Sequence, residues 1–578
     1  MRRARPAEAV GCPRLITAPP AADAVAASEL PPAADASTTS GRGGWSDDAP
    51  RLLALAAAVR VALVAGGRAA DRLCAGVPFT DVDYAVLTDG AREAAGGRSP
   101  FLRATYRYPP LLAWLLVPNV ALLAEWGKLL FCAADVLTGA LLIRLLRRHA
   151  GVPPRAACAY AAAFLLHPFA IAVSTRGNAD ALPVLAVVGA LSLLLDGRTR
   201  AAGALLGLAV HLKLYPVIYS VPMALWLAQP RHGGRRAHGD NRRATPAAGA
   251  TRSCCGRRTP LLAALLPDDW RHYTAHARYA EVATLAASTL ASLTALTAVS
   301  YAACGRDYLA HALLYHVGRS DPRHNFSPWW LPQYYSLGAA AAAARTAAAA
   351  ATAAAAAAAA AAANGTAAVA VGSGARPLAR LPSAGALALD AVHRVLASWG
   401  PACATAPQLA LVVLLGCAYG PTQLPLALFA QTLAFVAWNR VVTAQVTMQG
   451  GDERGVAPRL GGCKQAHPPR RHSTARTQVT VAPPPSPPPP PQYFHWWLAL
   501  LPLALPTVVP RWGRTGGRTS AALAAAWTLS ELGWAWPALQ LELRGQAAWL
   551  CLWAASCAHF CANVALLCGV LAYAGAGP

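Results

Sequence analysis

The sequence predicts an all-α polytopic membrane protein with about 10–12 transmembrane helices, at about 20 apolar residues for each crossing. Of its 578 residues, 55% are hydrophobic and only 13% are charged, about half the charged share of an ordinary soluble domain. The formal net charge is +24, from 50 basic and 26 acidic residues. The basic residues form no aromatic-interleaved patch of the kind that binds nucleic acid. Composition therefore argues against a cytosolic enzyme and against a nucleic-acid partner.

Apolar segments recur along most of the chain. Residues 1–50 lack periodicity and are rich in Ala, Pro and Arg, which predicts a disordered N-terminal arm. A membrane domain is then expected over 51–445 and again over 492–578. The segments 52–67, which Arg60 interrupts, and 181–196 are shorter than a standard span, whereas two others are long enough for hairpins. The hydropathy criterion places the apolar segments at 52–67, 128–146, 156–174, 181–196, 201–229, 281–303, 405–445, 493–510, 520–537 and 547–575.

Three segments have the composition of insertions. Residues 231–258 are rich in arginine, residues 339–375 are nearly polyalanine, and residues 446–491 are polar and end in a proline run. Polyalanine has a high helix propensity, so 339–363 could form a helix, even a spanning one, although we favour a low-complexity expansion. The fourteen cysteines show no spacing that predicts a disulfide framework or a metal site.

Charge sets the expected topology. The arginines of the N-terminal arm place it in the cytosol, so the first span delivers residues 68–127 to the lumen. The proline-broken segment 109–126 is then expected to lie in the interface as short helices. Because successive spans cross the membrane in alternate directions, four polar clusters are expected on the lumenal face. Such clusters in a multispan protein usually mark a functional site. They are residues 80–83, 176–180, 211–216 and 315–326.

These clusters carry a family resemblance. Residues 79–84 (FTDVDY) and 97–109 (GRSPFLRATYRYP) closely resemble the catalytic subunits of the GPI mannosyltransferase I (PIG-M) family. The resemblance continues in order through residues 174–180 (STRGNAD), 211–216 (HLKLYP), 319–327 (RSDPRHNFS), 438–441 (WNRV) and 492–496 (QYFHW). The proline-rich segment 446–491 separates the last two motifs, which are close together in the family.

The resemblance implies a GT-C glycosyltransferase fold in the endoplasmic reticulum membrane, with the active site facing the lumen. It implies dolichyl-phosphate mannose as the donor and glucosaminyl-phosphatidylinositol, often inositol-acylated, as the acceptor. The first mannose would be joined through an α1,4 bond. A small accessory membrane subunit resembling PIG-X is also expected.

Such a reaction inverts the anomeric carbon once and needs a base on the acceptor hydroxyl and a stabilised leaving phosphate. Asp81 or Asp83 can supply the base, and we favour Asp81. Arginine can grip a phosphate bidentately, and Lys213 is notable because lysine occurs only three times in the chain. The expected substrate-binding residues are Arg103, Arg107, Arg176, Asn178, Asp180, His211, Lys213, Tyr215, Arg319, Asp321, Arg323, His324 and Asn325.

A divalent metal is the main open point of mechanism. A lipid monophosphate carries less charge than a nucleotide diphosphate, and this face is rich in cations, so we predict catalysis without a metal or other cofactor. Two alternative functions are another dolichyl-phosphate-sugar-dependent glycosyltransferase of the same fold and a multispan lipid or solute transporter. A transporter would predict an internal repeat and polar residues at mid-membrane depth, neither of which the sequence shows.

Overall fold

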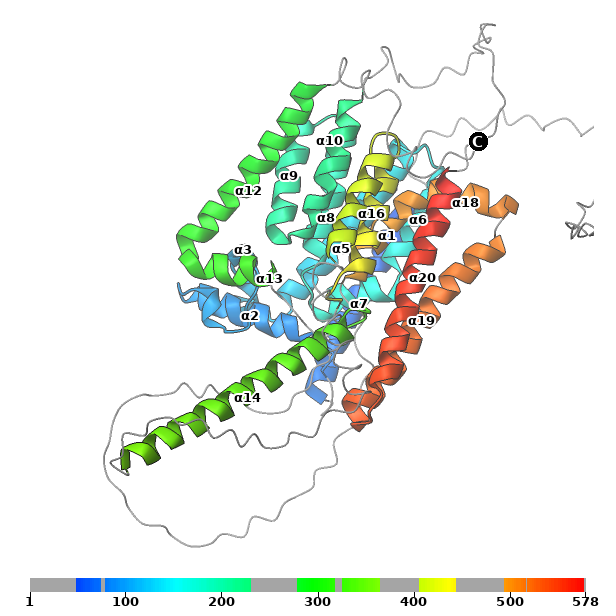
Figure 1. Ribbon diagram of the computed structural model, residues 1–578. Coiled ribbons are helices and arrows are strands. Elements are labelled where there is room, and N and C mark those ends of the chain that lie inside the picture. The colour runs from blue at the N-terminus through cyan, green and yellow to red at the C-terminus, as the bar shows by residue number, and fades with distance from the viewer. Residues whose placement is uncertain are drawn as a thin grey trace, which may run out of the picture. The chain divides into compact units, whose positions relative to one another are not determined.

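The computed structural model describes residues 48–73, 78–229, 278–317, 325–363, 405–442, 493–515 and 517–575. Most of the N-terminal arm and the segments 231–258 and 446–491 lie outside these ranges, so their predictions are not tested. The described part is built of helices (Figure 1). Within it, four helices are long and apolar enough to cross a membrane: Asp48–Leu73, Trp126–Arg148, Tyr279–Leu314 and Trp549–Ala574. The prediction of an all-α polytopic membrane protein is confirmed, while the number of spans stays a prediction.

The first helix is longer than its apolar core. Helix α1 (Asp48–Leu73) has 26 residues, so it extends beyond the predicted 52–67 at both ends. Arg60, which interrupts the apolar run, is fully buried against α5 (Trp126–Arg148), where it meets Asp135. The charge therefore does not end the span, because a neighbouring helix supplies its partner.

The segment between α1 and α5 contains short helices only. After α2 (Val82–Ala95) and the turn η1 (Pro100–Leu102) come α3 (Pro110–Leu115) and α4 (Pro118–Ala121), of six and four residues. At 1.5 Å per residue neither can cross a bilayer. The structure thus agrees with the expectation that 109–126 does not span.

The predicted span 156–174 is bent. Helices α6 (Pro154–Leu165) and α7 (Pro168–Arg176) meet at an angle of 54°. Pro168 starts α7 and cannot donate the backbone hydrogen bond that would continue α6. The bend sets the C-terminal end of α7, which carries the 176–180 cluster, against α2.

Close packing of small residues joins α9 (Thr199–Leu212) to α12 (Tyr279–Asp307). A Cβ atom on Gly203 would lie 2.0 Å from Ser288 Oγ and 2.6 Å from the Leu285 carbonyl oxygen. One on Gly207 would lie 2.5 Å from the Thr289 carbonyl oxygen. The four-residue glycine spacing allows the two backbones to approach in the way small residues do between membrane helices.

The predicted hairpins at 201–229 and 405–445 are each two helical arms. In the first, η2 (Tyr215–Tyr219) and α10 (Ser220–Ala228) follow α9 after a break at Lys213. In the second, the helix Thr405–Tyr419 precedes α16 (Leu424–Trp438), and Gln431 donates to the Val412 carbonyl at 2.8 Å. This side-chain bond ties the two arms together.

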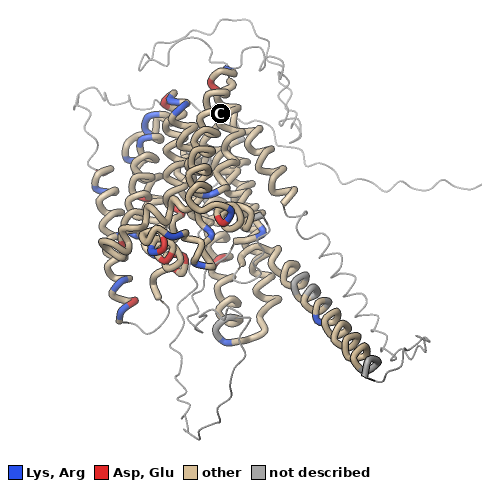
Figure 2. Tube along the Cα trace, turned by 90° about the vertical axis from the view of Figure 1, so that its left-hand side faces the viewer, with Lys and Arg blue, Asp and Glu red and all other residues tan. Residues whose placement is uncertain are grey.

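The remaining elements are α8 (Ala181–Leu195), α13 (Tyr315–Val317), α14 (Trp330–Ala363), α17 (Phe494–Leu498), α18 (Leu501–Thr515), α19 (Gly517–Arg544) and α20 (Trp549–Gly575). Helix α14 continues through the polyalanine segment as far as Ala363 (Figure 1), so the expectation that 339–363 can be helical is confirmed. Long stretches of the helices carry no charged residue (Figure 2), as expected for membrane-spanning segments.

Candidate active site

The first acidic pair is held at the start of α2. Asp81 is the N-cap residue, and its carboxylate accepts a hydrogen bond from the Asp83 backbone N–H at 3.0 Å. Its own N–H donates to the Arg176 carbonyl at 2.9 Å. Asp81 is only 8% exposed. The predicted clusters 80–83 and 176–180 therefore meet in the structure.

A glycine permits this contact. Gly177 follows α7 in the left-handed region, with φ 96°, and a Cβ atom there would lie 2.4 Å from the Tyr84 ring. The Tyr84 hydroxyl also donates to the Ala124 carbonyl at 2.7 Å. Glycine is the residue that tolerates both this backbone conformation and this close approach. The end of α7 is thus fixed against α2.

The environment of Asp81 suits a base. Burial, and after it the carboxylate of Asp83, raises the pKa of Asp81 from 3.8 to about 7, against the opposing effects of the Asp83 N–H and of Arg176. Burial, and then Asp83, also raises the pKa of the Tyr108 phenol well above its usual value, with smaller effects from Asp180 and Asp81. A base with a pKa near the working pH is the most effective one. Tyr108 thus lies close to all three carboxylates.

A second group of contacts surrounds Asp180. Its carboxylate pairs with the Lys213 ammonium and accepts a 3.0 Å hydrogen bond from Trp496 Nε1. The Lys213 Nζ atom lies 4.7 Å from the centroid of the Trp496 ring, and Tyr215 stacks on that ring at 3.9 Å. The Asn178 side chain accepts from the Asp180 N–H at 3.1 Å. The structure thus brings together four predicted residues and adds Trp496, which the sequence analysis placed in a motif but not in the site.

Lys213, one of the residues expected to bind substrate, has its ammonium group paired with Asp180 in the structure, and its substrate-binding role stays a prediction. Its charge is therefore already balanced before any substrate binds.

Two other cations flank Phe79, just before the acidic pair. The Lys128 ammonium donates to Thr80 Oγ1 at 2.6 Å and lies 6.0 Å from the Phe79 ring centroid. The Arg176 guanidinium lies 5.7 Å from the same ring centroid, and its buried Nε has no hydrogen-bond partner in the described structure. Lys128 is 3% exposed and was missed in the sequence analysis. The rarity of lysine pointed to it as strongly as to Lys213.

His211 faces a different element. It is 5% exposed, and its Nε2 lies 3.4 Å from Ser300 Oγ on α12. Its Nδ1 is buried and makes no hydrogen bond within the described ranges. No contact joins it to the Asp180 group among the described residues, and its substrate-binding role stays a prediction.

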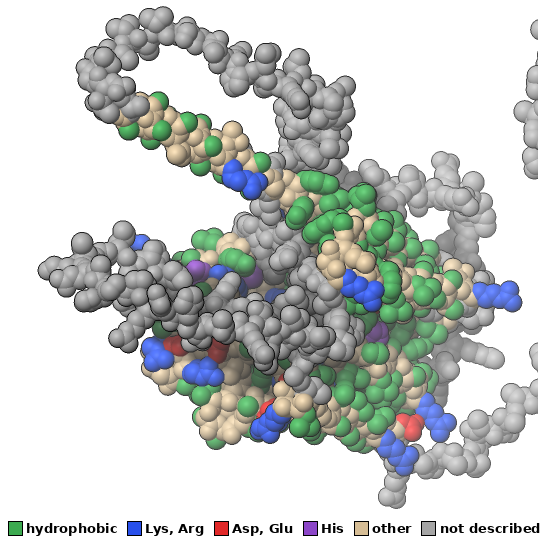
Figure 3. Space-filling model, turned by 90° about the horizontal axis from the view of Figure 1, so that it is seen from below, with side chains coloured by type: hydrophobic (Ala, Val, Ile, Leu, Met, Phe, Trp, Pro, Cys, Tyr) green, Lys and Arg blue, Asp and Glu red, His purple; other side chains and the backbone are tan. Residues whose placement is uncertain are grey.

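Arg103 and Arg107 each contact another side chain in the structure. Arg103 forms an ion pair with Asp89 at 3.3 Å and is 44% exposed in its side chain. Arg107 lies 4.5 Å above the Tyr315 ring centroid and donates to the Tyr106 carbonyl. Acidic and basic side chains lie next to one another on the face seen from below in Figure 3. The substrate-binding role of both arginines stays a prediction.

Asn325 joins two chain segments. Its side chain donates to the Arg440 carbonyl at 2.8 Å and accepts from the N–H groups of Ser327 and Val442, each at 2.9 Å. The amide therefore holds residues 325–327 against residues 440–442. Four other expected substrate-binding residues lie outside the described ranges, namely Arg319, Asp321, Arg323 and His324.

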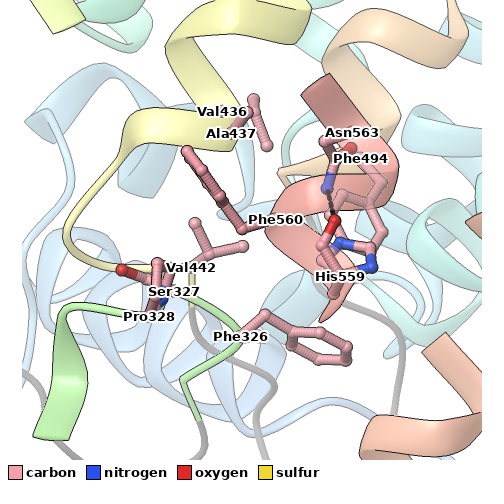
Figure 4. A pocket seen from close by; sticks show the side chains of 10 residues that line it. All are labelled: Phe326, Ser327, Pro328, Val436, Ala437, Val442, Phe494, His559, Phe560 and Asn563. Carbon is pink, nitrogen blue, oxygen red and sulfur yellow. Dashed lines mark hydrogen bonds between the residues drawn. The ribbon is translucent and has the colours of Figure 1, made fainter. Parts of the chain in front are cut away.

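A small pocket lies beside this junction (Figure 4). Its lining includes the aromatic rings of Phe326, Phe494 and Phe560, and His559 and Asn563 of α20 add polar groups. Asn563 donates to the His559 carbonyl at 2.9 Å, so its amide is engaged within the helix. The pocket does not include any residue of the acidic pair.

No group of three or more His, Cys, Asp or Glu side chains in the described ranges is arranged to hold a metal ion. Catalysis without a metal stays a prediction.

Comparison with known proteins adds independent findings. A family profile described as "Mannosyltransferase (PIG-M)" matches residues 173–242, 271–359, 387–448 and 490–571. A zebrafish (Danio rerio) protein named "GPI alpha-1,4-mannosyltransferase I, catalytic subunit" is 31% identical over 520 residues, covering 90% of this chain and 95% of its own. The Emericella nidulans protein named "GPI mannosyltransferase 1" is 31% identical over 68% of this chain and 76% of its own. A Saccharomyces cerevisiae protein of the same name is 30% identical, over 64% and 70%.

Proposed function

Because the chain belongs to the PIG-M mannosyltransferase family, we propose that it adds the first mannose to a GPI-anchor precursor. The resemblance found in the sequence motifs is thereby confirmed. The donor would be dolichyl-phosphate mannose and the acceptor glucosaminyl-phosphatidylinositol, acylated or not, joined through an α1,4 bond. The observation that assigns this function to particular residues is the hydrogen bond from the Asp81 N–H to the Arg176 carbonyl, which holds the acidic pair next to a cation at the end of α7.

The reaction follows from the position of Asp81. In the proposed step its carboxylate removes the proton from the 4-hydroxyl of glucosamine, and the oxygen forms a bond to C1 of mannose. The bond from C1 to the phosphate oxygen breaks, and its electron pair leaves with dolichyl phosphate. Attack from the opposite side converts the β-linked donor to an α-linked product, as inversion requires.

Charges near Asp81 support this role. Asp83 lies two residues away on the first turn of α2, and its buried Oδ2 makes no hydrogen bond to a described residue. It is therefore able to accept a substrate hydroxyl. Arg176, at the end of α7, accepts the Asp81 N–H at its carbonyl, and its guanidinium lies 5.7 Å from the Phe79 ring centroid, where it can meet the departing phosphate.

Location and partners follow from the family. We propose that the protein works in the endoplasmic reticulum membrane, with Asp81 on the lumenal side and with a small PIG-X-like subunit beside it. The arginines of the N-terminal arm would then remain in the cytosol. No metal ion takes part in the proposed step.

An in vitro transfer assay tests the proposal. Microsomes from cells that lack this activity, carrying the expressed protein, are given radiolabelled dolichyl-phosphate mannose and glucosaminyl-phosphatidylinositol. We expect a labelled glycolipid that α-mannosidase cleaves and that forms equally well with EDTA. Label on an N-glycan precursor instead would favour the alternative glycosyltransferase, and no transfer at all would contradict the proposal.

A further inference from the structure

Two cations lie beside Phe79: Lys128, which is buried, and Arg176, which is partly buried with its Nε atom shielded from solvent. Lys128 belongs to the first turn of α5, and Arg176 ends α7. In the part of the chain that is described, neither forms an ion pair, whereas Lys213 is paired with Asp180. A buried charge without a partner is costly, so such a pair of cations favours an anion between or beside them.

Their free hydrogen-bond donors point to the same conclusion. A lysine ammonium has three N–H donors, and Lys128 uses one of them on Thr80 Oγ1 at 2.6 Å. Its other printed neighbours are the Tyr84 and Phe79 rings, at 5.2 Å and 6.0 Å from the centroids. Arg176 keeps a buried Nε without a partner. Several donors are therefore available for the oxygens of a ligand.

The two carboxylates that act on Arg176, Asp81 and Asp71, both accept hydrogen bonds from other groups, Asp81 from the Asp83 N–H. Asp71 accepts hydrogen bonds from the Phe79 N–H, the Thr80 N–H and the Thr80 hydroxyl. Its carboxylate is thus engaged on Thr80 and forms no ion pair with Lys128 or Arg176 in the described structure. Asp71 instead fixes the turn that presents Thr80 to Lys128.

We propose that Lys128 and Arg176 form the binding site for the phosphate of the lipid-linked donor and for the dolichyl phosphate that remains after transfer. The proposal rests on the function proposed above and adds Lys128 to the residues that bind substrate.

Charge balance explains why two cations are needed. The donor is a phosphodiester with one negative charge, and the leaving dolichyl phosphate is a monoester with about 1.5–2 negative charges near neutral pH. As Asp81 accepts the proton of the acceptor hydroxyl, it loses its own negative charge. The positive excess around Phe79 therefore grows as the charge on the phosphate grows, which stabilises the transition state more than the bound donor.

Product inhibition tests the site. The rate of mannose transfer is measured with Lys128→Gln, Lys128→Arg and the control Arg92→Gln, whose side chain is 56% exposed on α2 and pairs with Asp89. Each variant is inhibited with dolichyl phosphate and, separately, with uncharged dolichol. Correct folding is checked by size-exclusion chromatography.

We expect Lys128→Gln to lower kcat about 10²–10³-fold, as loss of one preorganised donor to developing charge does. It should weaken inhibition by dolichyl phosphate at least about tenfold, with an unchanged KM for the acceptor and unchanged inhibition by dolichol. Lys128→Arg should restore most of the inhibition, and Arg92→Gln should match the wild type.

An unchanged inhibition constant for dolichyl phosphate in folded Lys128→Gln would overturn the assignment, even if the rate falls. If that variant does not fold, Arg176→Gln must show the same loss of inhibition, and a normal constant there overturns the site. Failure of the wild type to transfer mannose would instead refute the proposed function, so the two failures are distinguishable.

Discussion

Replacing Arg60 by methionine should destabilise the helical bundle strongly. Arg60 Nε and Nη2 both lie 3.3 Å from Asp135 Oδ2, and Nη1 donates to the Leu165 carbonyl at 2.8 Å. Both side chains of the ion pair are 0% exposed. His495 Nε2 lies 3.1 Å from the other carboxylate oxygen. The substitution leaves Asp135 buried with only His495 beside it.

The expected magnitude follows from that burial. Breaking a buried pair by removing one partner costs about 3–5 kcal/mol, because the other charge stays desolvated. Replacing both partners in Arg60→Met/Asp135→Leu removes the charge problem and leaves chiefly the Leu165 carbonyl without its donor, at about 1–3 kcal/mol. The double variant should therefore be more stable than either Arg60→Met or Asp135→Asn.

Thermal denaturation of the purified protein in detergent measures this order. The midpoint should fall most for the two single variants and least for the double variant. Arg144→Met is the matched control, since its ion pair with Asp196 has a side chain 45% exposed and should contribute less than about 1 kcal/mol. A double variant with the lowest midpoint of all would refute the reasoning.

Other predictions concern the site and its supporting helices. Burial raises the pKa of Asp81 to about 7, and only its deprotonated form can act as the base. The value of kcat/KM should therefore rise about tenfold per pH unit below pH 7 and level off above it. A rate that does not change between pH 5 and pH 8 would exclude Asp81 as the base. Gly203→Leu should sharply reduce the yield of folded protein, because its Cβ meets Ser288 and a backbone oxygen, and a normal size-exclusion profile would contradict this. Trp496→Phe, which loses the 3.0 Å hydrogen bond to Asp180, should lower activity about fivefold at one lost hydrogen bond of ~1 kcal/mol, while wild-type rates would show that the bond is dispensable.

The sequence predicted that the clusters 80–83 and 176–180 share one membrane face, from the order of the apolar segments and the charges between them, but not how each side chain is used. The structure brings these two clusters into contact at Asp81 and Arg176. The ion pairs inside the helical bundle could not be predicted from the sequence. In the sequence Arg60 only interrupts an apolar segment, and its partner Asp135 on α5 is known only from the fold. The partner of Lys213 was likewise set by a tertiary contact.

The missed residue Lys128 shows a second limit. It opens an apolar helix, where a lysine is ordinarily interpreted as an interfacial anchor. Only the fold turns it towards Thr80 and buries it. Arg103 was expected in the site from its motif and its charge, and the structure shows it paired with Asp89 and 44% exposed in its side chain.

Mannose transfer by Asp81→Asn tests the central claim most directly. The control is Asp89→Asn, a carboxylate on the same helix that is 37% exposed and pairs with surface arginines. Both are expressed in cells lacking the activity and assayed with labelled dolichyl-phosphate mannose at equal protein levels. Asp81→Asn should lose at least about 100-fold in rate, as removal of a general base does, and Asp89→Asn should stay within about twofold. Equal activity of the two variants would contradict the account.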